Sequence, residues 1–213
     1  TMTRVKGLEV DGAFGIPVVI ASFLAHLIVL GALQYSYGVL YVFLRDDDTL
    51  DGGSPASVSL VGSLSVSFFL GLGVVTGRLA EAVGNSVVVI IGGVAIGTGL
   101  IGSSFVSLVW MLYATYGVLV GVGMSFTFSP SVFIVQQWFV SRRSLATGFA
   151  VAGSGIGTML AAPLLDVMFS NFGWRTSFRI LGLVYSGALV PLGCVYRRPG
   201  FSLSSGLGAY TSI

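Results

Sequence analysis

Charged residues are scarce in this sequence: Lys, Arg, Asp and Glu make up only 8% of its 213 residues. Soluble domains carry roughly 25% charged residues, so the composition excludes an ordinary water-soluble domain. The formal net charge is only +2, and the basic residues stand between apolar runs instead of forming one patch. This distribution argues against a nucleic-acid-binding protein.

Reactive side chains are also scarce. There is one cysteine, Cys194, and one histidine, His26. A single cysteine cannot form an intrachain disulfide or a cysteine-built metal site, and we interpret Cys194 as a small buried apolar residue. The apolar runs hold no paired acids. We therefore predict no catalytic residue, no metal and no cofactor, and we expect that the protein is not an enzyme.

What is abundant is apolar side chains and glycine. Hydrophobic residues make up 54% of the chain, glycine occurs 31 times, and the mean hydropathy is +0.96. This composition predicts an all-α polytopic membrane protein, because glycine is more frequent in membrane helices than in soluble ones. G-x-x-x-G pairs, which let membrane helices approach closely, occur at Gly73/Gly77, Gly93/Gly97, Gly117/Gly121 and Gly153/Gly157.

Six apolar segments are long enough to cross a bilayer, which takes about 20 residues in a helix. We predict helices over 13–44, 55–76, 86–106, 110–136, 144–166 and 175–196. Turns are predicted at 77–84 and 169–174. The first run far exceeds a signal-peptide core of about 7–15 residues, so we expect a retained span. We divide the chain into an N-terminal cytoplasmic segment (1–12), a six-helix bundle (13–199) and a disordered cytoplasmic tail (200–213).

The distribution of lysine and arginine predicts the orientation, because cytoplasmic loops are enriched in both. Six spans put both termini on one side of the membrane. That side would carry Arg4, Lys6, Arg78, Arg142, Arg143, Arg197 and Arg198, and the other would carry Arg45, Arg175 and Arg179. Seven cations against three predict cytoplasmic termini. Three tryptophans fall near predicted helix ends, where aromatic belts form: Trp110, Trp138 and Trp174.

Several short motifs stand next to the predicted helices. Residues 11–15, D-G-A-F-G, precede the first helix and resemble the D-G-G-W-G-W motif of the monocarboxylate transporter family, which belongs to the major facilitator superfamily. Residues 138–148, W-F-V-S-R-R-S-L-A-T-G, followed by Gly153 and Ser154, resemble Y-F-x-K-R-R-P-L-A-N-G-x-A-x-A-G-S. Residues 172–175 match its F-G-W-R. Residues 77–84 resemble the superfamily loop G-x-L-A-D-R-x-G, with Glu81 in place of Asp.

The resemblance covers about residues 11–199 and implies the first half of a carrier built from two six-helix bundles. Such a carrier would move small organic anions by alternating access. The sequence departs from the family late in helix 1, where members that move lactate-like acids carry a lysine. The matching stretch, 31–38, holds no cation. Residues 34–39 also resemble oxalate/formate antiporters, which leaves that type of antiport as an alternative.

The resemblance and the intramembrane polar residues nominate candidate site residues. For the substrate path these are Gln34, Tyr35, Tyr37, Thr127, Thr147 and His26. For gating or motif roles they are Asp11, Gly12, Gly15, Gly77, Glu81, Gly84, Arg142, Arg143, Gly148, Gly153, Trp174 and Arg175. Ser125 and Ser129 accompany Thr127. His26 could relay protons, or simply bond to a neighbouring helix. Asp166 could pair with Arg175 or Arg179 to close the outer turn, or these arginines could attract anions there.

Two hypotheses follow. In the first, the chain is half of a carrier in the lipid bilayer, with a small organic anion as substrate, a proton as candidate coupled ion, and a second six-helix bundle or homodimer mate as partner. The Gly/Ala face from Gly148 to Gly157 would contact that bundle. In the second, the chain is a non-transporting six-helix protein or a partial gene product that dimerises. On family grounds we expect the plasma membrane.

Overall fold

The computed structural model describes residues 15–47, 49–51, 54–139 and 142–196. Over these residues the chain is helical apart from short connections, as the sequence predicts. The predicted terminal segments 1–12 and 200–213, and with them Asp11 and Gly12, lie outside the described residues.

The first two crossings are both interrupted. The first consists of α1 (Gly15–His26), the π-helix η1 (Leu27–Tyr35) and α2 (Tyr37–Arg45). The second consists of α3 (Pro55–Gly71) and α4 (Gly73–Val83), which meet at an angle of 47°. α3 begins at the predicted residue, 55, with Ser54 as N-cap accepting from the backbone N–H of Ser57 and with Pro55 at the first position, where proline is favoured.

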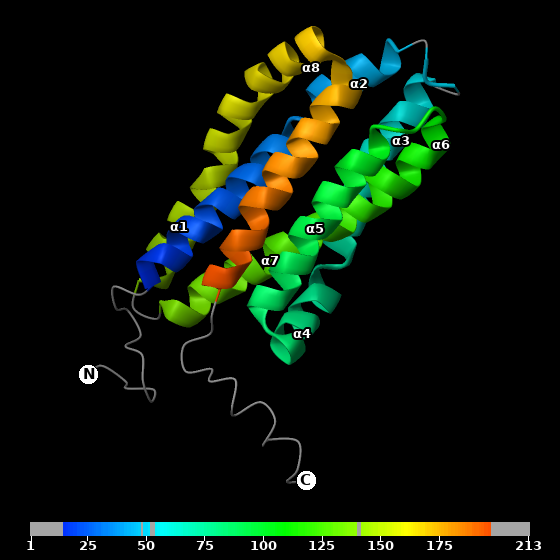
Figure 1. The fold of residues 1–213 in the computed structure, drawn as a ribbon. Coiled ribbons are helices and arrows are strands. Elements are labelled where there is room, and N and C mark those ends of the chain that lie inside the picture. Colours follow the sequence, from blue (N-terminus) through cyan, green and yellow to red (C-terminus); the bar gives the residue numbers. More distant parts are fainter. Residues whose placement is uncertain (1–14, 48, 52–53, 140–141, 197–213) are drawn as a thin grey trace, which may run out of the picture.

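The remaining crossings follow in chain order. α5 (Asn85–Ser103) is the third. The fourth is built from α6 (Val109–Leu112), the π-helix η2 (Tyr113–Val120) and α7 (Gly121–Trp138). The last element, α8 (Arg143–Val195), has 53 residues and consists of two helices that meet at Gly173, whose φ of 72° is not helical. Figure 1 shows its two arms running in opposite directions.

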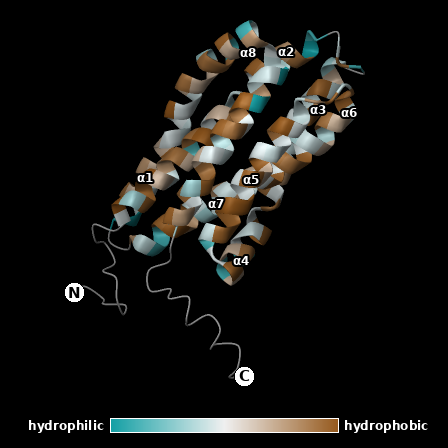
Figure 2. Ribbon diagram, viewed as in Figure 1, coloured by the Kyte–Doolittle hydropathy of each residue, from teal (hydrophilic) through white to brown (hydrophobic). Residues whose placement is uncertain are grey.

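The helices have the length and composition of membrane spans. Four helical segments are long and apolar enough to cross a membrane: 15–45, 85–103, 109–138 and 143–195. The bent pair α3–α4 meets the same criteria when it is taken as one span. Because α8 contributes two arms, the described residues cross the bundle six times. In Figure 2 the hydrophilic residues gather mainly toward the two ends of the bundle.

The two ends of the bundle differ in the arginines they carry. The start of α1, the end of α4, the α7–α8 junction and the end of α8 lie at one end, here called the α4 end (Figure 1). Arg78, Arg142 and Arg143 belong to it. The opposite end, called the α2 end, holds the end of α2, the start of α3 and the break in α8. Arg45, Arg175 and Arg179 belong there, in the grouping that the sequence predicts.

Glycine pairs bring helices into backbone contact. A Cβ atom on Gly93 or Gly97 would meet Leu189 or Ser186 on the second arm of α8. A Cβ on Gly157 would lie 3.0 Å from the Cα of Gly31 in η1, and one on Gly153 would meet the carbonyl oxygen of Phe23. The predicted role of the G-x-x-x-G pairs in helix packing is thus confirmed here. The prediction that Gly153 and Gly157 face another bundle is wrong.

Four further predictions are corrected by the structure. Residues 77–83 are helical, not a turn, because α4 continues to Val83. Residues 169–172 are likewise helical, and the chain reverses at the single residue Gly173. Trp138 and Trp174 lie at helix ends as predicted, but both are buried, so only the exposed Trp110 resembles a belt residue. Cys194 is exposed on α8, because its side chain points away from the bundle.

Candidate functional site

A groove of about 340 Å³ opens between η1–α2 and α3, and we call it the η1–α3 groove. It includes two of the residues nominated for the substrate path. Its lining comprises Gln34, Tyr37, Gly38, Tyr41, Ser59, Gly62, Ser63 and Val66. Gln34 is half-buried, and its side chain makes no hydrogen bond with another described residue. The groove therefore offers an amide and several hydroxyl groups within a largely apolar bundle.

A row of serines on α3 forms one wall of this groove and continues past it. Ser59, Ser63 and Ser67 are exposed and stand four residues apart, so they share one helix face. Each hydroxyl donates to the carbonyl four residues earlier, at 2.9, 3.1 and 2.8 Å. These bonds satisfy the hydroxyl protons and leave oxygen lone pairs free to accept. We did not predict this row from the sequence, although its i, i+4 spacing is visible there.

Tyr37 and Tyr35 have different surroundings. The Tyr37 hydroxyl donates to the Val58 carbonyl at 2.7 Å, and the ring lies over Gly62, where a Cβ atom would collide with it. Gly62 thus makes room for Tyr37 in the groove wall. Tyr35 is 59% exposed on the surface of the first crossing. The structure therefore places Tyr37 in the groove, together with Gln34, and Tyr35 outside its lining.

Both helices predicted to line a path contain π-helical turns. η1 ends at Tyr35, immediately before the groove, and the Ser36 hydroxyl closes it by donating to the Gly31 carbonyl at 2.8 Å. η2 lies in the fourth crossing, and its Tyr116 hydroxyl reaches the Leu33 carbonyl at 3.5 Å. π-helical turns are rare and are frequent at functional sites. η1 contributes Gln34 to the lining of the η1–α3 groove, which favours that groove as the candidate path.

His26 is fully buried and lines neither this groove nor the one described next. Its Nδ1 lies 2.7 Å from the carbonyl oxygen of Ser22 on its own helix. A carbonyl only accepts, so Nδ1 carries the proton and Nε2 carries the lone pair. Nε2 has no partner among the described residues, and the ring packs edge-on against Phe128 at 5.0 Å. The bonding partner of His26 is its own helix, not the neighbouring one.

The nominated hydroxyls of the fourth crossing turn inward, away from the groove. Thr127 is buried against Gly92 of α5 and donates to the Gly123 carbonyl at 3.0 Å. Ser125 lies 3.2 Å from the Thr76 hydroxyl on α4. Thr147, at the start of α8, has a buried hydroxyl without a described partner. The structure therefore separates these residues from Gln34 and Tyr37.

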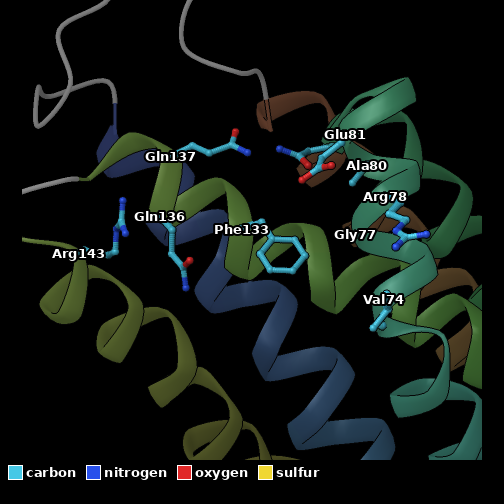
Figure 3. Close-up of a pocket in the computed structure, with 11 residues that line it drawn as sticks. Val74, Gly77, Arg78, Ala80, Glu81, Phe133, Gln136, Gln137 and Arg143 are labelled. Atoms are coloured by element: carbon cyan, nitrogen blue, oxygen red, sulfur yellow. The ribbon is translucent and has the colours of Figure 1, made fainter.

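A second groove, of about 500 Å³, lies at the α4 end, and we call it the α4–α7 groove. Its walls are α4, the end of α7 and the first residue of α8. Figure 3 shows Val74, Arg78 and Glu81 on the α4 side, across from Gln136 and Arg143. The lining comprises Gly73, Val74, Gly77, Arg78, Ala80, Glu81, Asn85, Phe133, Gln136, Gln137 and Arg143. The nominated motif residues Gly77, Glu81 and Arg143 therefore come together in one groove.

The charged side chains of the α4–α7 groove form no ion pairs with other described residues. Glu81 and Arg78 form no ion pair with each other or with another described residue, and both are exposed. Arg143 donates only to the Phe139 carbonyl, at 3.4 Å. Gly77 lies against the Phe133 ring, and Gly84 has a φ of 104°, a value that favours glycine and turns the chain into α5.

Other nominated motif residues have separate positions. Arg142 is the exposed residue before α8. Gly148 lies on an open face of α8, where a Cβ atom would meet nothing within 4 Å among the described residues. Gly15 begins α1 at the α4 end, where a Cβ atom would lie 2.7 Å from the Phe139 ring. These residues contribute helix ends and helix contacts but line neither groove.

The last two nominated residues are Trp174 and Arg175, which connect α8 to the loop after α2 at the α2 end. The Trp174 indole N–H donates to the Asp47 carboxylate at 2.6 Å, and Arg175 lies 3.8 Å from it. Arg175 also donates to Thr49 and to the Val106 carbonyl. Asp166 is exposed and pairs with neither arginine, so the predicted closing ion pair is wrong. Asp47 takes that role because the loop after α2 reaches the break in α8.

Electrostatics at this end favour the charged form of Asp47. Desolvation by burial acts to raise its pKa, but the hydrogen bonds from the hydroxyl and N–H of Thr49, the Trp174 bond and the charge of Arg175 act against it. Together they hold the pKa of Asp47 below its usual value. Arg179 does not pair with a described acid: it donates to Ser104 at 3.1 Å and stacks on Phe105. The α2 end is therefore a structural clamp.

Comparison with known proteins gives a consistent result. Residues 12–206 match the Major Facilitator Superfamily. The chain is 35% identical to human monocarboxylate transporter 1 over 175 residues, 81% of the chain and 34% of that protein. It is 33% identical to rat monocarboxylate transporter 2, over 91% of the chain and 38% of that protein. With human monocarboxylate transporter 14 the identity is 33%, over 83% and 34%.

The chain spans about a third of the length of the curated relatives it matches. All three relatives are named as transporters and none as an enzyme, in agreement with the missing enzyme signature in the sequence.

Proposed function

This chain belongs to the major facilitator superfamily, as an all-α, multi-pass, monocarboxylate-transporter-like membrane protein, and we propose that it supplies the N-terminal six-helix half of a secondary carrier. The carrier would move small organic anions by alternating access, with a proton as the candidate coupled ion. The second half would be another six-helix bundle, or a second copy of this chain. Both termini would be cytoplasmic and the membrane would be the plasma membrane.

The main support for the proposal is the open, polar lining of the η1–α3 groove. Polar groups within a membrane are costly unless they face protein or water. Here Gln34 and the row from Ser59 to Ser67 lie open on one side of the bundle. A second bundle packed over this side would enclose the groove and turn it into a polar path near the bundle interface, where carriers of this kind bind substrate.

The chemistry of the groove suits a weakly held anion. The Gln34 amide can donate to a carboxylate, and Ser59 or Ser63 can do so once its hydroxyl releases the backbone carbonyl to which it donates. Such neutral donors lack the extra strength that a charged donor gives. Among the described residues, no cation lines the groove. This supports a carrier that holds its anion at the groove by neutral donors, and it leaves lactate-like acids and oxalate or formate as candidate substrates.

Uptake into liposomes tests the proposal. The protein is reconstituted as its native gene encodes it, including any coding sequence beyond these residues, and supplied with labelled lactate, pyruvate, formate or oxalate. We expect saturable uptake of at least one anion, reduced by Gln34→Leu and retained by Thr98→Val, a polar-to-apolar change on the exposed face of α5. No uptake of any of the four anions would contradict the proposal and favour a non-transporting protein that dimerises.

A further inference from the structure

The α4–α7 groove contains a buried donor that nothing in the described chain satisfies. Asn85 lines the groove and is only 2% exposed, yet its Nδ2 has no hydrogen-bond partner among the described residues. A buried polar group without a partner carries a free-energy cost. The groove beside it has ample room, about 500 Å³, for a small molecule. The geometry therefore favours an acceptor that enters the groove.

The same residue begins a helix whose end is uncapped. α5 starts at Asn85, has 19 residues, and receives no side-chain cap from Gly84. The first N–H groups of a helix have no partner within it, and the helix dipole makes that end attractive to anions. The unpaired Asn85 amide and the start of α5 therefore favour the same kind of acceptor, a negatively charged oxygen.

The charges that line the groove agree with this. Arg78 and Arg143 line it from α4 and from α8, and Glu81 is the acid among its lining residues. No described ion pair neutralises either arginine. Two cations against one carboxylate leave a positive balance, so the groove attracts an anion, although Glu81 weakens that attraction.

We propose that the α4–α7 groove is an oxyanion-binding site, in which Asn85, the start of α5, Arg78 and Arg143 hold the carboxylate of a small organic acid. The choice of a carboxylate over another oxyanion rests on the proposed function; the site itself does not. It lies at the α4 end, remote from the η1–α3 groove, so an anion bound here would occupy a mouth of the path and not its middle.

The chain contains only two asparagines, Asn85 and Asn171, and this permits a direct test. Asn171 lies near the α2 end and donates to the Val167 carbonyl at 2.8 Å, so it serves as an internal control. The 213-residue chain, labelled with ¹⁵N-asparagine and held in lipid bicelles, is titrated with sodium oxalate or lactate at constant ionic strength. We expect the Asn85 side-chain amide signals to shift saturably while those of Asn171 stay in place.

Three substitutions identify the charges involved. We expect Arg78→Gln to weaken binding roughly two- to fivefold, and Glu81→Gln to strengthen it by a similar factor, because each changes one exposed charge beside the anion. Arg45→Gln removes the same charge at the opposite end and should leave the affinity unchanged. A purely structural role for these residues would not make Glu81→Gln bind more tightly.

Other results would overturn the proposal. An Asn85 amide that responds to neither carboxylate excludes the site. A response to inorganic phosphate alone, or only to bicelles that contain phosphatidylglycerol, assigns the groove to phosphate or to a lipid headgroup and contradicts the carboxylate. If uptake succeeds in the liposome assay while the Asn85 side-chain amide signals do not shift, the proposed groove site is wrong and the proposed carrier function stands.

Discussion

Trp174 donates its indole N–H to the carboxylate of Asp47 at 2.6 Å, which joins two residues 127 positions apart in the sequence. Trp174 follows the break in α8, and Asp47 follows the end of α2. Their bond therefore fixes the sixth crossing to the loop after the first crossing. Arg175 and Thr49 complete the contact. The α2 end is held by this partly buried polar contact, whereas Arg78, Glu81 and Arg143 at the α4 end form no ion pair with described residues.

Replacing Trp174 by Phe should destabilise the protein. The ring volume is largely kept, but a partly buried carboxylate loses a hydrogen bond, which costs about 1–3 kcal/mol. Trp110→Phe is the matched control, because Trp110 is exposed near the same end. Thermal unfolding of the chain in detergent, followed by circular dichroism, measures both. Equal midpoints for the two variants would show that the bond contributes nothing.

The same bond predicts a dependence on pH. Because the folded protein holds the Asp47 pKa below its usual value of 3.8, the carboxylate stabilises the fold above that pH. The contribution is lost as pH falls through the lowered pKa. Wild type should therefore unfold at a higher temperature than Asp47→Asn at pH 6, and the two midpoints should converge below pH 3.8. Asp46→Asn should show a smaller difference, since the Arg45–Asp46 pair is exposed.

Close packing between α8 and the first crossing predicts that two neighbouring glycines differ in how well they tolerate substitution by alanine. A methyl group at Gly157 would meet the backbone of Leu27 and Gly31, whereas one at Gly155 would meet nothing within 4 Å. We expect Gly157→Ala to destabilise by about 1–3 kcal/mol and Gly155→Ala to be neutral or to stabilise by up to about 1 kcal/mol. Unfolding midpoints of the two variants in one detergent make the comparison. Similar loss in both would contradict this packing.

The histidine tautomer is a further testable feature. His26 is the only histidine in the chain, so ¹⁵N-histidine labelling gives one pair of ring signals. Its Nδ1 contacts the Ser22 carbonyl, which predicts the neutral tautomer with the proton on Nδ1 and a free Nε2. Solid-state NMR of the chain in lipid at neutral pH distinguishes the two tautomers by their nitrogen shifts. A proton on Nε2 would contradict this geometry.

Most of the fold can be predicted from the sequence because membrane helices are recognised by their long apolar runs. Spans of about 20 apolar residues, the helix start at residue 55 and the glycine pairs all correspond to features of the structure. The errors occur where polar residues stay helical. The charges of residues 77–83 favour a turn there, but Arg, Leu, Ala and Glu are good helix formers, and α4 continues through them.

The candidate sites are less predictable because they depend on which helix faces meet. Family resemblance draws attention to Gln34 and Tyr37, which line one groove, yet it cannot show that Thr127 turns toward α5. Nothing in the order of residues places Asp47, and not Asp166, beside Arg175. That pairing depends on the length of the loop after α2 and on the reversal at Gly173, which only the folded chain determines.

The proposed carrier function requires the η1–α3 groove to be a water-accessible path and not a lipid-facing surface. Cysteine labelling in liposomes tests this on the protein as its native gene encodes it, after Cys194→Ala and removal of any cysteine encoded beyond these residues. The three variants to compare are Ser63→Cys in the groove, Ser65→Cys beside it, and Leu183→Cys on the exposed apolar side of α8.

A charged, membrane-impermeant thiol reagent is added to each variant, on either side of the membrane. Thiols react as thiolates, which form in water and not in lipid. We expect Ser63→Cys to react. Ser65→Cys should stay protected because Ser65 is 2% exposed, and Leu183→Cys should stay protected although Leu183 is 68% exposed. A Ser63→Cys variant that reacts no faster than Leu183→Cys would contradict the claim.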